Sequence, residues 1–160
     1  MVKQPDSHVK LVFVARDLLD LSVLLLGAAS TLVEGINDGV RARGFPDIRP
    51  AHGYAFVRLA PDGATVGELA DHLTVTKQAA SQMVDELVTK GYVERRPHPT
   101  DARARLIVLT AKGWACTRAA DAAAEETLRP WADAIGPRRL AALRADLGRL
   151  SRPGRIRPTW

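Results

Sequence analysis

Hydrophobic positions follow helical spacing over most of the chain. Residues 8–44 contain no proline and form the first predicted helix, either continuous or with a break near Gly27, Gly35 or Gly39. Within it, residues 18–26 are apolar on nearly every face, whereas a helix at the surface of a soluble protein shows one apolar stripe. We therefore expect this segment to be covered on several sides, either as the central helix of the domain or in part by a second copy of the chain. Because residues 18–33 are interrupted by Asp20 and too short to span a bilayer, they are predicted to form a buried helix.

Two shorter helices follow, each with a start signal. A turn at 44–46 leads to a helix over 50–59, which has a proline at its first position. A second turn at 61–63 precedes Thr65 and Glu68, which have the spacing of a capping box. The residues after the cap show the spacing of one buried helical face: Val66, Leu69, Ala70 and Leu73.

A further helix begins one tight turn later. Thr76 is its predicted N-cap, the helix covers 77–90, and Gly91 stands at the C′ position. Its buried stripe is predicted to consist of Ala80, Met83, Val84, Leu87 and Val88. Two helices joined by so short a turn match a helix-turn-helix.

Strand periodicity is found only after this pair of helices. Residues 92–95 and 105–109 are predicted strands on either side of 97–101, whose two prolines deny that segment a place in the ladder. A hairpin directly after the second helix of a helix-turn-helix is the wing of a winged helix. The predicted fold class is therefore mostly α (α+β): a winged helix-turn-helix with a two-stranded wing, flanked by long N- and C-terminal helices.

Helical spacing returns behind the hairpin. Thr110 caps a long predicted helix, which ends at the Gly136-Pro137 break, and a last helix carries leucines at coiled-coil seam spacing over two heptads: Leu140, Leu143, Leu147 and Leu150. The chain is thus divided into an N-terminal helical region at 1–48, the winged helix-turn-helix at 49–113, C-terminal helices at 114–150 and a loose tail rich in arginine and proline at 151–160.

Composition narrows the classes of function. The net charge of +5 suits an acidic partner such as nucleic acid. Cys116 is the only cysteine, so an internal disulfide is impossible and a reducing compartment is expected. The polar N-terminus lacks the apolar region of a signal peptide, and we expect a soluble, cytoplasmic protein without a membrane partner.

Catalytic and metal-binding patterns are missing from the sequence. The four histidines have no metal-ligand spacing. No nucleophile–base–acid set and no glycine-rich phosphate loop are found. We therefore expect no enzyme, no cofactor and no metal.

The segment 63–113 resembles the MarR family of bacterial transcriptional regulators. The match rests on the order and spacing of the whole winged helix, including Asp101-x-Arg103 in the wing and Leu109-Thr110-x-x-Gly113 behind it. The resemblance implies double-stranded DNA as a partner and an obligate homodimer joined through its N- and C-terminal dimerisation helices. A dimer would place two recognition helices about one DNA turn apart, so the operator is expected to be an inverted repeat.

The exposed face of helix 77–90 is the predicted reading surface. Gln78, Ser81, Gln82 and Asp85 share that face. Glutamine can offer a donor and an acceptor to adenine in the major groove, with serine adding a shorter contact, whereas Asp85 would meet phosphate repulsion. Thr76 and Lys77 are placed for phosphate contacts. The same side chains would also suit a merely solvated face, but the wing that follows favours DNA contact.

Arginines surround the loop of the wing: Arg95, Arg96, Arg103 and Arg105. A narrow minor groove concentrates negative potential and attracts an inserted arginine. By the resemblance, Arg103 is this wing arginine and Asp101 is the acidic residue that braces it. In the alternative interpretation, Asp101 and Arg103 merely close the hairpin.

Two further features concern regulation. Many family members bind a small aromatic or phenolic acid, and His52, Tyr54 and Arg58 lie on the helix that would border such a cleft, although ordinary packing is the stronger interpretation of His52 and Tyr54. Some members sense peroxide through a cysteine in the first helix. Cys116 instead follows the wing, and we expect a small buried hydrophobe rather than a redox sensor.

The sequence thus predicts a sequence-specific transcriptional regulator. A repressor that a ligand releases from DNA is favoured over an activator. The alternative is a winged helix used as a protein–protein interaction module without DNA binding. Such a module would more often show apolar residues on its recognition face, and the amide-bearing face beside wing arginines favours regulation.

Overall fold

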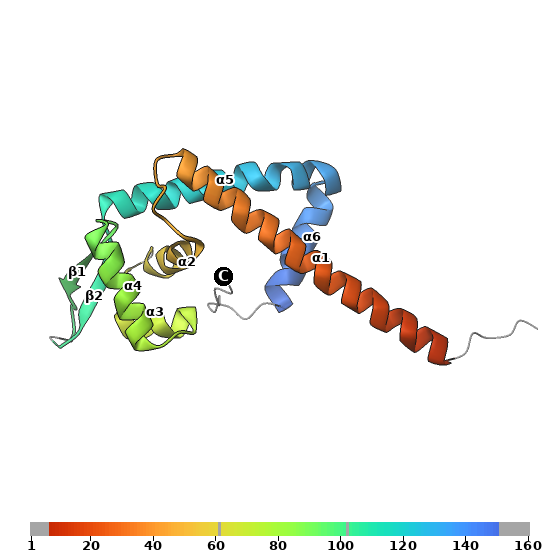
Figure 1. Ribbon diagram of the computed structural model, residues 1–160, viewed down its shortest axis with the longest axis horizontal. Helices are drawn as coiled ribbons and strands as arrows, with labels where there is room; N and C mark the ends of the chain where they lie inside the picture. The colour runs from red at the N-terminus through yellow and green to blue at the C-terminus, as the bar shows by residue number, and fades with distance from the viewer. Residues whose placement is uncertain (1–6, 61, 102, 151–160) are drawn as a thin grey trace, which may run out of the picture. The chain divides into compact units, whose positions relative to one another are not determined.

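A computed structural model describes residues 7–60, 62–101 and 103–150, with side chains from residue 17 onward (Figure 1). Its elements are α1 (Ser7–Ala42), α2 (Pro50–Leu59), α3 (Val66–Leu73), α4 (Lys77–Thr89), β1 (Val93–Pro97), β2 (Arg105–Leu109), α5 (Ala111–Ile135) and α6 (Pro137–Leu150). The mostly helical fold class with a two-stranded wing is confirmed.

Packing divides the chain into two compact units, of which the first ends at Glu34 and the second begins at Gly35. The four-part division drawn from the sequence stays a prediction, and its tail at 151–160 lies outside the described residues.

The first unit contains the N-terminal part of α1. Its large apolar side chains are exposed in the single chain, with exposed fractions from 45% at Leu25 to 70% at Leu26. The prediction that the chain's own domain buries this helix is therefore wrong, and cover by a second copy stays a prediction.

The expectation that the apolar segment of α1 is too short to span a bilayer is also wrong. Asp17–Ala42 is long and apolar enough to cross a membrane by length and composition alone. The sequence-based estimate stopped at residue 33, whereas the low-charge helix continues through Ile36 and Val40. Length and composition do not distinguish a membrane helix from a helix that another protein surface covers.

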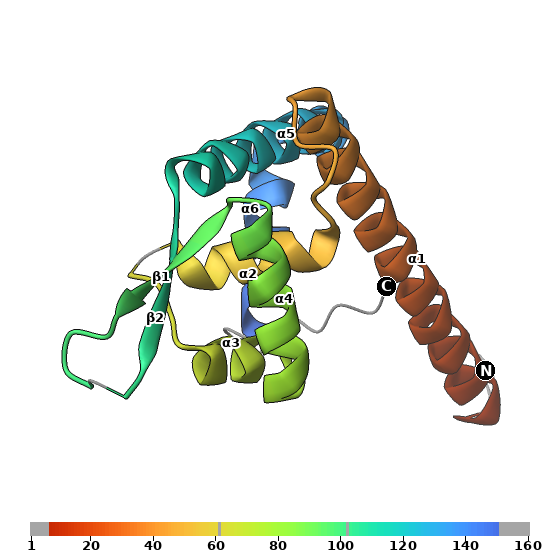
Figure 2. The ribbon, with the colours of Figure 1, turned by 60° about the vertical axis from the view of Figure 1, so that its left-hand side comes forward.

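The core of the second unit lies between the helix-turn-helix, the hairpin, α2 and the start of α5. Its largest fully buried side chains include Tyr92, Leu59, Leu69, Leu73, Leu87 and Ile107. The predicted stripe of α4 is confirmed, with Met83 and Val88 at its half-buried margin. Figure 2 shows α4 beside α3, with the hairpin following its C-terminal end.

The hairpin is antiparallel, with Val93 opposite Leu109 and Pro97 opposite Arg105. The first strand therefore begins and ends later than predicted, and Pro97 closes it. A proline is tolerated there because the end of an edge strand needs no further ladder donor. On the other side of β2, Ala64 and Ile107 exchange backbone hydrogen bonds of 3.0 and 2.8 Å, which tie the segment before α3 to the wing.

The Leu109-Thr110-x-x-Gly113 pattern forms the joint between the wing and α5. The Thr110 N–H donates to the Tyr92 carbonyl at 3.0 Å, and its hydroxyl donates to the Gly91 carbonyl at 2.7 Å. The same hydroxyl accepts from the Gly113 N–H at 3.2 Å as the N-cap of α5. A Cβ at Gly113 would lie only 2.3 Å from the Tyr92 carbonyl oxygen, so the first turn of α5 can approach the hairpin only through glycine.

We expect Gly113→Ala to lower the free energy of unfolding by about 1 to 3 kcal/mol, because the added methyl meets a backbone atom that cannot move aside. Gly148→Ala is the matched control, since no atom of the residues that the structure describes lies within 4 Å of a Cβ there. Alanine should raise helix stability at that position by about 0.5 to 1 kcal/mol. Urea denaturation at one fixed protein concentration measures both effects. Equal stability of the two variants would contradict the close contact at Gly113.

Candidate nucleic-acid interface

Each of the two helices of the helix-turn-helix begins with a side-chain hydrogen bond to its first turn. The Thr65 hydroxyl accepts from the Glu68 N–H at 3.3 Å, and Glu68 accepts from the Thr65 N–H at 2.7 Å, which confirms the capping box. The turn is made by Thr74 in the left-handed region, at φ 54°. A threonine in that conformation costs about 1 to 2 kcal/mol, so the surrounding packing must hold the turn in place.

The exposed side of α4 begins at its N-cap. The Thr76 hydroxyl accepts from the Ala79 N–H at 3.1 Å, and its proton is still available to donate to a phosphate oxygen. Lys77, Gln78 and Gln82 are exposed and Ser81 is half-buried. Within the described part of the chain, the side chains of Gln78, Ser81 and Gln82 make no hydrogen bond to another residue, so their polar groups are available to a partner.

The register of the hairpin divides the wing arginines between its two faces. Cross-strand partners point to the same side, so Arg95 and Arg105 share the face of buried Ile107, which packs toward the core. Arg96 lies on the opposite face. The sequence grouped all the wing arginines together and did not resolve this division.

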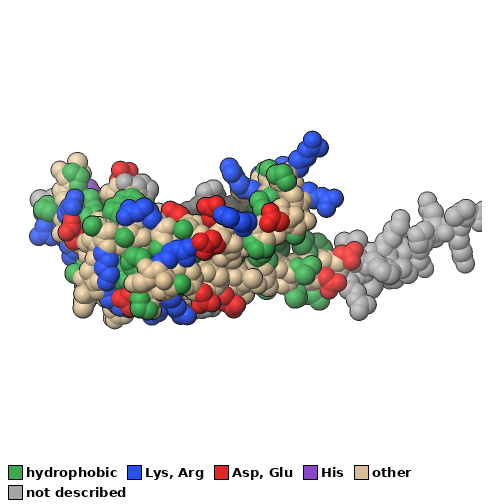
Figure 3. Space-filling view, turned by 90° about the horizontal axis from the view of Figure 1, so that it is seen from above, with side chains coloured by type: hydrophobic (Ala, Val, Ile, Leu, Met, Phe, Trp, Pro, Cys, Tyr) green, Lys and Arg blue, Asp and Glu red, His purple; other side chains and the backbone are tan. Residues whose placement is uncertain are grey.

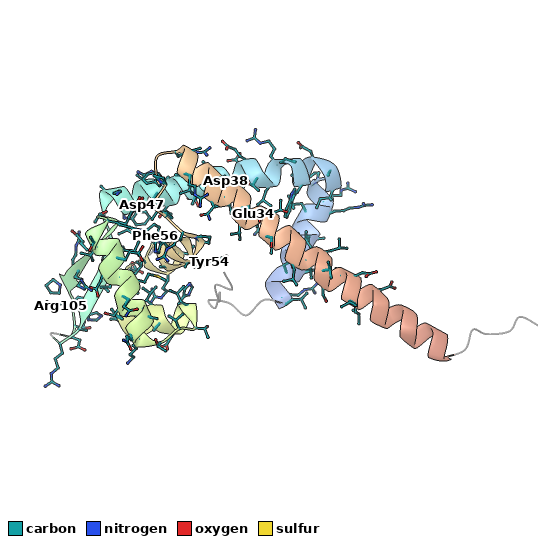
Figure 4. The ribbon with its side chains drawn as sticks, in the orientation of Figure 1. Glu34, Asp38, Asp47, Tyr54, Phe56 and Arg105 are labelled. Carbon is teal, nitrogen blue, oxygen red and sulfur yellow. The ribbon has the colours of Figure 1, made fainter. Side chains whose placement is uncertain are left out.

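Two of the four wing arginines are already paired with carboxylates. Arg95 reaches Asp85 of α4 at 2.5 Å, and Arg96 reaches Glu94 at 2.5 Å. Arg103 and Arg105 are exposed, and neither has a carboxylate within 4.0 Å among the described residues. In Figure 4, Arg105 is labelled on the hairpin, away from the loop and helix that carry Asp47 and Phe56. The unpaired positive charge of the wing thus belongs to Arg103 and Arg105.

The loop of the wing is shaped by two side chains. Asp101 accepts from the backbone N–H of Arg103 at 2.9 Å, so it braces Arg103 through the main chain. The described residues contain no ion pair between the two side chains. His98 Nδ1 accepts from the backbone N–H of Asp101 at 3.2 Å. Sequence reasoning gave His98 no role, although its position between two prolines marked it as part of the loop.

The side of α4 that faces α2 carries an ion-pair cluster that sequence reasoning missed. Glu86 accepts from Lys90 at 2.7 Å and from Arg49 at 2.5 Å, and Lys90 also donates to the Asp47 carbonyl at 2.7 Å. The hydrogen bond from Lys90 lowers the pKa of Glu86 and keeps it ionised. Because α4 is tied in this way to the segment before α2, its position depends on that segment. The i, i+4 spacing of Glu86 and Lys90 was the only signal in the sequence.

The residues predicted to border an effector cleft all lie on α2, and two of them already have partners. His52 is fully buried beside Arg49 and Glu86, and burial lowers its pKa. Arg58 donates to the Gly63 carbonyl at 3.0 Å and lies 3.1 Å from a Glu68 oxygen. Tyr54 is half-buried, and burial raises the pKa of its phenol.

Cys116 is 2% exposed, which confirms that it is buried. Burial raises the pKa of its thiol to about 11. The thiol is therefore protonated near neutral pH and is a poor nucleophile.

The face to which α5 contributes carries charges of both signs. In the space-filling view of Figure 3, basic and acidic side chains are interspersed over that face. One such pair on α5 is Arg129 with Glu125, 3.0 Å apart. A mixed pattern of this kind attracts a polyanion less than a face of one sign does, so this face offers a polyanion no concentration of positive charge.

Comparison with known proteins supports this assignment of the fold. The model of the MarR family matches residues 50–104. The multiple antibiotic resistance protein MarR of Escherichia coli is 48% identical over 46 residues, which are 29% of this chain and 32% of that protein. An uncharacterised HTH-type transcriptional regulator of Mycobacterium leprae is 35% identical over 75 residues, 46% of this chain and 52% of that protein. The matches thus span between a third and about half of these curated relatives.

The fold similarity extends further along the chain than the sequence similarity. The crystal structure of a MarR mutant from E. coli complexed with operator DNA has a TM-score of 0.68 at 23% identity, covering 85% of this chain and 96% of that one. The likeness therefore includes the flanking helices as well as the winged helix. The segment 50–104 is thus similar in sequence to the MarR family, and the chain shares the fold of solved MarR structures.

Proposed function

We propose that this protein is a sequence-specific transcriptional regulator that binds double-stranded DNA as a homodimer and acts as a repressor. One observation carries the proposal: α4 presents the polar side chains of Gln78, Ser81 and Gln82 beside a wing whose Arg103 and Arg105 have no carboxylate partner among the described residues. An interaction module would more often present apolar side chains there. Such a role also fits a cytoplasmic protein.

On DNA, the N-terminal half of α4 would lie in the major groove. Gln78 and Gln82 would read base edges with their amides, and Ser81 would add a shorter contact. Thr76 and Lys77 would hold phosphate oxygens near the positive end of the helix dipole. The solved complex of a MarR mutant with operator DNA supports this role for the shared fold.

The wing would reach the adjacent minor groove. Arg103 and Arg105 supply its unpaired charge, and the hydrogen bond from the Arg103 backbone N–H to the Asp101 carboxylate holds the backbone at Arg103 in place. Insertion of arginine is favoured where the minor groove is narrow, because the negative potential is concentrated there. Arg95 and Arg96 would add less to the phosphate contacts, since carboxylates already neutralise them.

Exposed apolar helices support the homodimer. On α6, Leu143 and Leu147 are 39% and 42% exposed, and Leu150 is 82% exposed, at the spacing of a helix–helix seam. The N-terminal part of α1 is also exposed and apolar. A second copy that covered both surfaces would place two α4 helices on one DNA duplex, and the operator would be an inverted repeat.

A small aromatic or phenolic acid would be the effector in this proposal. Arg58 is the cation on α2 that suits a carboxylate, but a ligand would have to compete with Glu68 for it. Because Glu68 belongs to the capping box of α3, such competition would disturb the start of the helix-turn-helix. This would link the effector to a loss of DNA affinity.

Selection from a randomised duplex library at moderate salt, followed by sequencing of the bound DNA, tests the proposed function. We expect enrichment of an inverted repeat with half-sites about one turn apart. A folded dimer that enriches no sequence would contradict sequence-specific regulation and favour the interaction module.

The wing model predicts unequal effects of two arginine substitutions on one hairpin. Arg103→Ala should raise the Kd for the selected operator by roughly tenfold to a hundredfold, because a groove contact is lost. Arg96→Ala removes the same charge but should cost less than about threefold, since Glu94 already neutralises that side chain. Fluorescence anisotropy with a labelled operator measures both values. Equal losses would show that net charge, and not the wing contact, sets the affinity.

The homodimer is tested on α6. The double substitution Leu143→Glu/Leu147→Glu should convert the dimer into a monomer, because buried carboxylates would repel each other across the seam. Ala145→Glu adds charge to the same helix away from the leucine seam and should leave the dimer intact. Sedimentation velocity gives the mass of each variant. A dimer that survives the double substitution would remove α6 from the interface.

A further inference from the structure

The ion pair between Asp85 and Arg95 joins the recognition helix to the wing. Arg95 Nη2 lies 2.5 Å from Asp85 Oδ1, and the two side chains are 36% and 60% exposed. Asp85 lies seven residues after Gln78 and therefore on the same face of α4 as the predicted reading residues. Arg95 lies on the side of β1 that faces α4. Its backbone is held there by the pairing of Arg95 with Ile107 across the hairpin.

A contribution to folding does not account well for this pair. Exposed ion pairs typically contribute about 0 to 1 kcal/mol to stability, and the backbone of each partner is already held, by α4 on one side and by the hairpin on the other. Its position has a larger consequence. A carboxylate on the face proposed to read DNA repels phosphate, and an unpaired arginine there would attract any phosphate regardless of sequence.

We propose that Asp85 is a specificity-determining residue, which holds the Arg95 guanidinium and so keeps that cation from binding phosphates without regard to sequence. The inference rests on the proposed function and deepens it. Each member of the pair masks the other: Arg95 removes the repulsion of Asp85, and Asp85 removes the indiscriminate attraction of Arg95. Recognition is thereby left to the neutral side chains Gln78, Ser81 and Gln82 and to the unpaired arginines of the wing.

Asp85→Asn keeps the shape of the side chain and releases Arg95. In a dimer this adds two cations, so the log–log salt dependence of binding to a random-sequence duplex should steepen by about 1.8. Between 50 mM and 200 mM salt the variant should therefore lose about tenfold more affinity than the parent protein does. At low salt its affinity for the random duplex should rise, and the ratio between operator and random duplex should fall.

Three further variants identify the source of this effect. Asp121→Asn makes the same charge change on α5 and should leave the salt dependence unchanged. Arg95→Gln uncovers Asp85 and should weaken binding to both duplexes. The double variant Asp85→Asn/Arg95→Gln carries neither charge and should return to the parent's salt dependence.

The measurement is fluorescence anisotropy with the selected operator and a random-sequence duplex over a series of salt concentrations. An equal effect of Asp121→Asn, or a double variant that stays steep, would overturn the role of the pair. If the parent protein discriminates its operator and Asp85→Asn leaves the salt dependence unchanged, only this inference fails. If the parent protein binds neither duplex, the proposed function fails and the inference fails with it.

Discussion

The side chain of Tyr92 is the contact on which the second unit depends. Its ring is fully buried, with ring centroids 6.2 Å from Phe45 and 5.8 Å from Phe56, and its hydroxyl donates to Asp47 at 2.7 Å. A buried tyrosine needs such a partner for its hydroxyl. Through one residue, the segment before α2, the end of the recognition helix, the wing and the start of α5 are all held together. Burial and the bond to Asp47 both raise the pKa of the phenol, so it remains a donor.

This arrangement explains how a helix of only 13 residues is held in a fixed position. Propensity alone stabilises so short a helix only marginally, so most of its order comes from tertiary contacts. One side of α4 is packed against the core, and Glu86 and Lys90 bind the segment before α2. Only the side that carries Gln78 is left for a partner. Displacement of the segment at 47–49 would move α4 with it, so a change at α2 has a physical route to α4.

Local signals predicted the elements well because they act within a few residues. The capping box at Thr65, the N-cap at Thr76 and the helix stop at Gly91 all lie where the sequence indicated. The partners of Arg95 and Arg96 were not predictable in the same way. Strand register decides which face each side chain takes, and a shift of one residue would exchange the faces. Exposure of α1 was missed for a related reason: an apolar pattern shows that a surface needs cover, but not which molecule supplies it.

That exposed surface ties the two parts of the proposed function together. The second unit has its own core around Tyr92, which includes Val40 near the end of α1, so the winged helix does not need the part of α1 before Gly35 for its packing. The apolar side chains of the first unit, by contrast, are stabilised only when another surface removes them from water, at about 25 cal/mol per Å² of buried apolar area. A second copy would supply this surface and a second α4 at once. Burial of apolar surface would then drive the assembly of two copies. Two-fold recognition of DNA would follow from the symmetry of that dimer.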